Sequence, residues 1–261
     1  MTILEVHNLK KVYTTRFGGN QVQALRNIQF SVEEGEYVAI MGESGCGKTT
    51  LLNILAALDR PTEGEVLLNG KNLVTVREKE IAAFRREHLG FVFQDFHLLD
   101  NFSLKDNIFL PLVLSNVPYK QMNEWLYPIA QKLGIVDILE KYPYEVSGGQ
   151  KQRLAIARAI AKDPKIFIFD DSFSALDLKT DAALRKALAE NVKDRTVIIV
   201  AQRISTILHA EQILVLDDGK IVGKGTHEEL LKSGEVYRQI AKSQLSAKEL
   251  GLEESEVALN E

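Results

Sequence analysis

The segment from Gly42 to Thr50 has the residue types and the spacing of a loop that binds phosphate groups. Its glycines allow the backbone to wrap a polyphosphate closely and to turn N–H groups inward. A strand-like run, Tyr37 to Met41, precedes it, and a helical pattern follows, whose N-terminus adds partial positive charge. This context predicts a nucleoside triphosphate site rather than a chance glycine-rich loop. The residues expected to contact the nucleotide are Gly42, Ser44, Gly45, Cys46, Gly47, Lys48, Thr49 and Thr50.

Two residues of this loop and one distant aspartate are expected to handle phosphate and metal. Lys48 should reach the β- and γ-phosphates of ATP, and the hydroxyl of Thr49 should ligate Mg²⁺. Asp170 directly follows the apolar run Ile166 to Phe169, the position of the Mg²⁺-holding carboxylate in phosphate-loop enzymes. A strand-end aspartate is a weak motif alone and gains weight downstream of a phosphate-binding loop.

A second anion site is predicted where Ser147, Gly148 and Gly149 open a helical pattern that continues through Lys151 to Ala161. In isolation, an ordinary glycine-rich helix cap would be the more common explanation. Two phosphate-binding sites in one chain, the loop at Gly42 to Thr50 and the helix start at Ser147, instead suggest that one ATP is held between two subunits. The loop would come from one subunit and the helix start from the other.

Composition narrows the possible partners and compartments. The net charge of −4 leaves no basic surplus for nucleic acid, so no nucleic-acid partner is expected. No apolar run is long enough to cross a bilayer, and the first residues lack the layout of a signal peptide. Cys46 is the only cysteine, which excludes an internal disulfide and favours the cytosol. Any membrane role must therefore come through a partner.

Cys46 itself allows two interpretations. A neighbouring lysine and a helix N-terminus both lower a thiol's pKa and raise its reactivity, which predicts modification that ATP would block. Alternatively, the side chain merely fills a small space.

The order of strand and helix patterns predicts an α/β fold, with a mostly parallel sheet flanked by helices. An antiparallel β portion is expected at the N-terminus, from Ile3 to Leu9 and Ala24 to Val32. An all-helical insertion is expected at about 100–145, broken into short pieces by proline. The expected domain covers 1–245, and an acidic tail covers 246–261. The prolines are Pro111, Pro118 and Pro128.

Taken together, the motifs resemble the ATP-binding subunits of ABC transporters, and the resemblance covers nearly the whole chain. It implies hydrolysis of ATP to ADP and phosphate, in a head-to-tail homodimer or heterodimer with two ATP molecules at its interface. It also implies a membrane-spanning partner subunit that exports a substrate, and hence a cytoplasmic location at the inner face of the membrane. The matching elements are Gly42 to Thr50, Gln94, Ser147 to Gln150, Asp170, and Ser174-Ala175-Leu176-Asp177.

The same resemblance implies roles for further residues. Tyr13 would stack its ring on adenine, although a partly buried aromatic at a strand edge is the plainer alternative. Gln94 would contact Mg²⁺ and sense the membrane partner. Ser147 and Gly149 would contact the γ-phosphate bound to the opposite subunit, and Asp177 would couple the two sites.

Two positions depart from the family in a way that bears on catalysis. Asp171 stands where the family has a glutamate that polarises the attacking water, and its side chain is one methylene shorter. Gln202 stands where a histidine would contact the γ-phosphate, and glutamine cannot carry the same charge. Because general-base catalysis depends on geometry, these changes predict slow hydrolysis. A non-catalytic, ATP-gated clamp is the rival hypothesis, and a soluble DNA-repair or translation member is a third.

The two halves of the chain resemble different branches of the family. Residues 1–164 are similar to ATPases that serve peptide-antibiotic resistance, lipoprotein release and macrolide efflux. Residues 165–245 are similar to ATP-binding domains of exporters, including the impaired site of heterodimeric ones. A hybrid joined near Asp163-Pro164 and a natural lineage with mixed features both explain this. The segments involved are Asp95 to Asp100 and Tyr142 to Gln150 in the first half, and Asp170 to Asp177, Val200 to Thr206 and Gly225 to Leu230 in the second.

Overall fold

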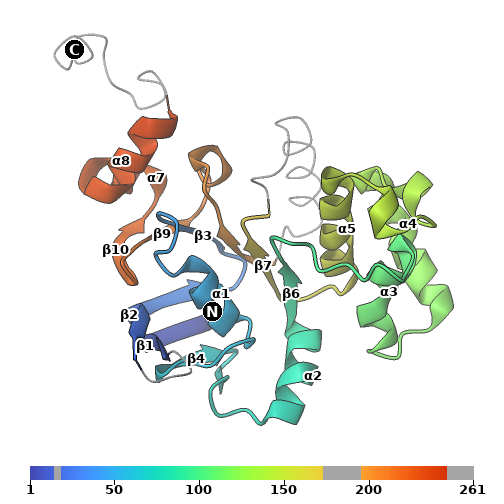
Figure 1. The fold of residues 1–261 in the computed structure, drawn as a ribbon, viewed down its shortest axis with the longest axis horizontal. Helices are drawn as coiled ribbons and strands as arrows, with labels where there is room; N and C mark the ends of the chain where they lie inside the picture. Colours follow the sequence, from blue (N-terminus) through green and yellow to red (C-terminus); the bar gives the residue numbers. More distant parts are fainter. Residues whose placement is uncertain (15–18, 173–194, 246–261) are drawn as a thin grey trace.

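The computed structural model of the chain describes residues 1–14, 19–172 and 195–245 (Figure 1). Its N-terminal part is an antiparallel sheet with the strand order β2-β1-β4-β5. The long pair β1 and β2 was predicted, and both strands extend beyond the predicted bounds. The strands are β1 (Thr2–Thr14), β2 (Gln21–Glu33), β4 (Glu63–Leu68) and β5 (Lys71–Asn72).

A second, six-stranded sheet has the order β10-β9-β3-β8-β7-β6. Its strands pair in parallel except for the antiparallel edge pair β9 and β10. The expected mostly parallel sheet is therefore confirmed. The strands are β3 (Tyr37–Met41), β6 (Leu89–Val92), β7 (Ile166–Asp170), β8 (Thr196–Val200), β9 (Gln212–Asp217) and β10 (Lys220–Gly225).

Most strands of the six-stranded sheet are apolar along their whole length because both faces are covered. Successive side chains point to opposite faces, so Val38 and Ile40 pack into one core while Ala39 and Met41 pack into the other. The first core lies against the antiparallel sheet and helices α1 (Lys48–Leu55) and α2 (Glu78–His88). The second lies under the other helices of the described residues, which are α3 (Leu104–Val113), α4 (Tyr119–Leu133), α5 (Gly148–Ala161), α7 (His227–Ser233) and α8 (Glu235–Gln244).

The helices of the predicted insertion, α3 and α4, form a group with α5 to the right of the sheets in Figure 1. One detail of its prediction was wrong, because Pro111 lies inside α3 and Pro128 lies inside α4. A proline inside a helix removes one backbone hydrogen bond, at a cost of about 3 kcal/mol. The buried faces of both helices outweigh that cost, with Ile108 and Leu112 in α3 and Leu126 in α4 almost fully enclosed.

Candidate active site

A pocket of about 960 Å³ opens at the edge of the six-stranded sheet where β3, β7 and β8 end. Because these strands are parallel, their carboxyl ends meet at this edge, where open α/β sheets place their ligands. Most of the predicted site residues are brought together here. Those lining the pocket are Gly42, Ser44, Gly45, Gly47, Lys48, Thr49, Thr50, Gln94, Asp170, Asp171 and Gln202.

Two glycines of the loop are required by close packing against neighbouring strands. Gly47 has a left-handed backbone (φ 105°), and a Cβ there would lie 2.5 Å from the carbonyl oxygen of Ala24 in β2. Gly42 has φ 148°, and a Cβ there would lie 2.1 Å from the carbonyl oxygen of Leu216 in β9. Any larger residue at either position would push the loop off the strands that shape it.

Lys48 arches back over its own loop. Its Nζ donates hydrogen bonds to the carbonyl oxygens of Gly42, at 2.8 Å, and Glu43, at 2.6 Å. Helix α1 begins at this same residue, so the positive end of a helix dipole lies at the loop. The ammonium group and the helix end together make this wall of the pocket attractive to anions.

Asp170 lies deep in the site, with only 6% of its surface exposed. Burial raises the pKa of its carboxyl group, and the neighbouring charge of Asp171 raises it further. A hydrogen bond from Thr49 and the charge of Lys48 act in the opposite direction. Two crowded carboxyl groups at the end of one strand make this part of the pocket attractive to cations.

The donors around Asp170 fit the ligand preferences of Mg²⁺. In the described part of the chain, no group of three or more His, Cys, Asp or Glu side chains could enclose a metal ion. Mg²⁺ is typically held by one or two carboxylates together with substrate phosphates, and it prefers oxygen ligands. The carboxylate of Asp170, the hydroxyl of Thr49 and the amide of Gln94 line one pocket and offer such oxygens.

Asp171 and Gln202, the two positions predicted to depart from the family pattern, are in direct contact. The Nε2 of Gln202 donates a hydrogen bond to Oδ2 of Asp171. Asp171 is buried, at 7% exposure, and its backbone has φ 44°, a conformation uncommon for residues other than glycine. Gln202 reaches it from the segment after β8.

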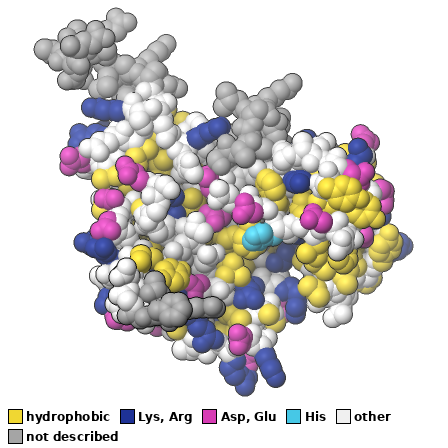
Figure 2. All heavy atoms as spheres, in the orientation of Figure 1, with side chains coloured by type: hydrophobic (Ala, Val, Ile, Leu, Met, Phe, Trp, Pro, Cys, Tyr) yellow, Lys and Arg dark blue, Asp and Glu magenta, His cyan; other side chains and the backbone are white. Residues whose placement is uncertain are grey.

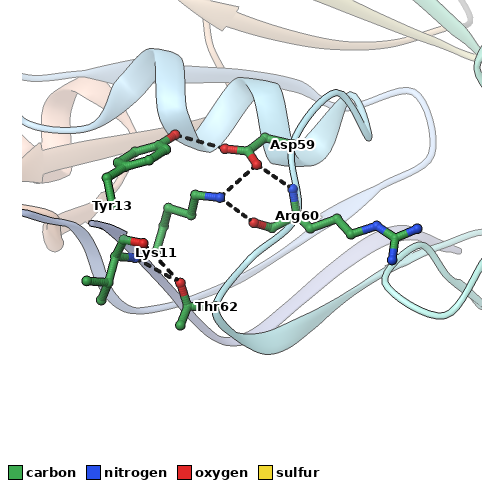
Figure 3. Close-up of polar contacts among 6 residues, drawn as sticks. Lys11, Tyr13, Asp59, Arg60 and Thr62 are labelled. Atoms are coloured by element: carbon green, nitrogen blue, oxygen red, sulfur yellow. Dashed lines mark hydrogen bonds and ion pairs between the residues drawn. The ribbon is translucent and has the colours of Figure 1, made fainter. Parts of the chain in front are cut away.

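Tyr13 is fixed through its hydroxyl group rather than through its ring (Figure 3). The hydroxyl donates to Oδ2 of Asp59 at 2.8 Å, and Nζ of Lys11 donates to Oδ1 at 2.7 Å. Burial raises the pKa of Asp59, but these two hydrogen bonds and one from the backbone of Arg60 outweigh it, so the pKa lies below its usual range. The same lysine lies 4.8 Å from the centre of the Tyr13 ring.

The ring of Tyr13 lies beside the pocket rather than in its lining. Tyr13 pairs with Val22 across β1 and β2, and directly opposite residues of an antiparallel pair share one face. Val22 lines the pocket, and the two residues are 42% and 60% exposed. They form an exposed apolar surface next to the phosphate-binding loop, which fits a platform for a base.

The second anion site is a capped helix start that lies outside this pocket. Ser147 caps α5, its Oγ accepting from the N–H of Gln150 while the Gln150 side chain accepts from the N–H of Ser147. Ser147 and Gly148 are exposed, and Gly149 is partly buried. This surface is available to a molecule or subunit outside the chain.

Helix α5 also supports the loop that follows Gln94. The guanidinium of Arg158 donates to the carbonyl oxygens of Phe96, at 2.6 Å, and His97, at 2.8 Å. Both acceptor residues have positive φ, 59° and 43°, so this tight turn depends on outside support. These two hydrogen bonds connect helix α5, which starts after Ser147, to the loop that follows Gln94.

Cys46 does not line the pocket, and its Sγ accepts a hydrogen bond from Nζ of Lys48 at 3.7 Å. Its side chain is 6% exposed and packs in the core with the antiparallel sheet. A Cβ on Gly42 would lie 2.6 Å from its Sγ, which shows how tightly the sulfur packs behind the loop. The burial favours the space-filling interpretation.

Several residues of the site carried no motif in the sequence. Asp59, which holds Tyr13, lies after α1. Arg26 and Asp218 form an ion pair of 3.0 Å at the pocket wall, and Gln244 at the end of α8 lines the pocket as well. Of the predicted elements, Ser174 to Asp177 and the tail 246–261 lie outside the described residues.

Comparisons with known proteins agree with this geometry. The family described as "ABC transporter" matches residues 25–174. The uncharacterized ABC transporter ATP-binding protein YvcR of Bacillus subtilis is 41% identical over 235 residues, which cover 88% of this chain and 91% of the relative. The bacitracin export ATP-binding protein BceA of Halalkalibacterium halodurans is 41% identical over 223 residues, covering 85% and 87%. Both alignments are longer than the first 164 residues and so extend past the expected junction.

A solved structure has the same architecture. The dimeric ATP-binding cassette MJ0796 bound to ADP and Pi matches with a TM-score of 0.80 at 33% identity, over 86% of this chain and 98% of that chain. Fold, pocket and sequence similarity therefore lead to one conclusion: the chain belongs to the family of ABC transporter ATP-binding proteins.

Proposed function

We propose that this chain binds Mg·ATP in the pocket at the sheet edge and hydrolyses it slowly to power export through a membrane-spanning partner. The observation that carries the proposal is the convergence of Lys48, Thr49 and Asp170 with the pair Asp171 and Gln202 in one pocket. The first three residues supply binding, and the last two replace the usual catalytic glutamate and histidine.

In the proposed reaction, each side chain has one task. Lys48 releases its hydrogen bonds to the carbonyl oxygens of its own loop and binds the β- and γ-phosphates of ATP instead. Thr49, Gln94 and Asp170 would hold Mg²⁺, which when bound neutralises charge developing on the phosphates. Asp171 orients the attacking water and accepts its proton, and the amide of Gln202 donates a hydrogen bond toward the γ-phosphate.

Both side chains of that catalytic pair are compromised for the task. The shorter carboxylate of Asp171 must act across a longer gap, and a misplacement of about 1 Å can cost roughly a hundredfold in rate. The amide of Gln202, which donates to Oδ2 of Asp171, cannot carry the charge of a protonated histidine. Binding of ATP does not depend on either group, so the proposal is of good binding with slow turnover.

The complete site is proposed to form between two copies of the chain or between this chain and a related one. Ser147 and Gly149 lie outside the pocket that holds Lys48, so one subunit does not bring its two phosphate cradles together. The related cassette MJ0796 is described as a dimer in its ADP- and Pi-bound state. A head-to-tail dimer would place the Ser147 helix start of one subunit over the nucleotide of the other.

A membrane-spanning partner is proposed because the chain supplies none of the spanning structure in its described part, where no helix is long and apolar enough to cross a bilayer. Relatives include BceA, named for bacitracin export, and the macrolide export ATP-binding/permease protein MacB of Acinetobacter baylyi, 38% identical over 84% of this chain and 33% of the relative. We place the chain on the cytoplasmic face of the membrane on this basis.

The surface between the sheets and the helical group suits such a partner. A groove of about 310 Å³ lies there, with apolar walls that include Phe91, Phe93 and Leu114 and with the cations Arg158 and Lys162. In Figure 2, hydrophobic side chains gather on the side of the molecule formed by the helical group. An apolar partner segment that carries a carboxylate would complement this groove.

Phosphate release at saturating Mg·ATP tests the hydrolysis, with Lys48→Ala as the control that removes phosphate binding. Slow release that exceeds the control supports the proposal. Release equal to the control, with ATP still bound by the unaltered chain, would establish the rival ATP-gated clamp instead. Sedimentation with and without ATP tests the dimer, and a chain that stays monomeric at saturating ATP would contradict a homodimer.

A further inference from the structure

Helix α8 ends beside the active site, and its last residue contacts the segment that carries Gln202. The Oε1 of Gln244 accepts a hydrogen bond from the backbone N–H of Ile204 at 2.9 Å. Its Nε2 donates to the backbone carbonyl oxygen of Gln202 at 2.8 Å. Both ends of one side-chain amide are therefore bonded to a single short segment, on either side of Arg203.

The segment needs this outside support for a simple reason. A 3₁₀ helix, Ile204–Thr206, begins there, and its N-cap residue Arg203 makes no side-chain capping bond. The first N–H groups of a helix have no partner inside it, and an arginine side chain has no acceptor to offer. Gln244 supplies the missing acceptor from a distant part of the chain.

Gln244 itself is held on a rigid element. Tyr237 and Ala241 of α8 are fully enclosed in the second core. The hydroxyl of Tyr237 is also hydrogen-bonded to Nδ1 of His227 at 2.7 Å, which fixes α8 to α7. A side chain on a well-packed helix can position its partner more closely than one on a loop.

We infer that Gln244 is a positioning residue for the hydrolysis proposed above, and the inference rests on that proposal. It holds the backbone of Gln202 so that the Gln202 amide reaches Asp171. The contacts form a continuous path from α8, through the Gln202 backbone and side chain, to the carboxylate of Asp171. Turnover therefore depends on how helix α8 docks, although the helix supplies no reacting group.

The test compares Gln244→Ala with Gln239→Ala, which makes the same change at an exposed position of the same helix. Gln244→Ala should lower kcat about tenfold, because a small displacement of a catalytic group is costly, and should leave the Kd for Mg·ATP within about twofold. Gln239→Ala should change neither. Gln244→Glu, which keeps the acceptor for Ile204 and loses the donor to Gln202, should have an intermediate kcat.

A double-mutant cycle distinguishes positioning from a general structural role. If Gln244 acts through the Gln202 side chain, Gln244→Ala should cost little further activity in a Gln202→Ala background. Equal losses in both backgrounds would overturn the inference, as would an unchanged kcat in Gln244→Ala. A fall in kcat matched by Gln239→Ala would overturn it too.

Backbone hydrogen exchange at Ile204 separates failure of this inference from failure of the proposed function. Loss of the Gln244 acceptor should speed exchange at Ile204 whether or not the chain hydrolyses ATP. If the unaltered chain releases no more phosphate than Lys48→Ala, the proposed hydrolysis fails. If exchange at Ile204 is the same in Gln244→Ala as in the unaltered chain, Gln244 does not hold the segment and the inference fails.

Discussion

The side-chain amide of Gln202 donates a hydrogen bond to the carboxylate of Asp171, which joins the two positions that were predicted to depart from the family pattern. One position follows β7 and the other follows β8, and the parallel pairing of these strands brings them together. A change at one of these residues therefore alters the surroundings of the other. The two should be replaced together as well as singly.

Tyr13 should contribute to nucleotide affinity through its ring. Tyr13→Ala should raise the Kd for ATP by about fivefold to a hundredfold, because stacking of a base on an aromatic ring contributes about 1–3 kcal/mol. Tyr13→Phe keeps the ring and loses only the hydrogen bond to Asp59, so its Kd should stay close to that of the unaltered chain. Calorimetric titration with ATP measures both values, and a small effect of Tyr13→Ala would identify Tyr13 as a structural strand-edge residue.

Cys46 should react slowly with a maleimide reagent, because its thiol is buried and a reagent reaches it only through local opening. A Cys46→Ala, Ser115→Cys double variant, which carries its thiol at an exposed position, provides the reference rate. We expect labelling of Cys46 to be slower than this reference by at least about tenfold, and bound ATP to slow it further by stabilising the closed loop. Labelling as fast as the reference would restore the alternative of an accessible, activated thiol.

Local motifs explain why much of the site was predictable. The phosphate-binding loop lies in one continuous segment, and its strand and helix neighbours follow it directly along the chain. Asp170 was found because a buried strand ends there, and parallel pairing then places Asp170 and Gln202 at one sheet edge. The bounds of β3 were also predicted, since a strand covered on both faces is continuously apolar.

Contacts between distant segments account for what the sequence did not reveal. Gln244 and Asp59 lie in no motif, and only the packing of α8 and of the turn after α1 makes them neighbours of the site. The side of the loop that Cys46 faces is likewise set by tertiary packing. The hybrid origin stays a hypothesis, to be tested by aligning 1–164 and 165–245 separately.

Lys162 should make the stability of the chain depend on pH. Burial, together with the charges of Arg158, Arg86 and Arg85, lowers the pKa of Lys162 to about 8. Between pH 8 and the ordinary lysine pKa, Lys162 keeps its proton in the unfolded chain and has lost it in the folded chain. The free energy of unfolding therefore increases as pH rises through this range. From pH 7 to 10.5, the contribution should grow by about 2 to 3 kcal/mol.

Urea unfolding of the unaltered chain and of Lys162→Met at the two pH values isolates this contribution, since other titrating groups are common to both chains. The difference in free energy of unfolding should shift in favour of the unaltered chain as pH rises. A difference that stays constant would show that Lys162 keeps an ordinary pKa in the folded state.

The catalytic pair provides the sharpest prediction. Asp171→Glu with Gln202→His should raise kcat by on the order of tenfold to a thousandfold, the range for a positioned acid–base group and one charge-stabilising donor. The longer carboxylate reaches further toward the attacking water, and an imidazole, when protonated, carries a positive charge that the amide cannot. The Kd for Mg·ATP should change little, because Lys48, Thr49 and Asp170 remain and only interactions stronger in the transition state speed the chemical step.

Each single replacement should gain less than the pair, since Asp171→Glu alone still faces the Gln202 amide and Gln202→His alone still faces the short carboxylate. Acid-quenched measurement of ATP cleavage in a single turnover, with the chain in excess over Mg·ATP, separates the chemical step from product release. Lys48→Ala introduced into the double variant should abolish the gain, which ties it to this site. If the unaltered chain already hydrolyses ATP at a rate that the double replacement does not improve, Asp171 is an adequate base as it stands, and the impaired-site interpretation is wrong.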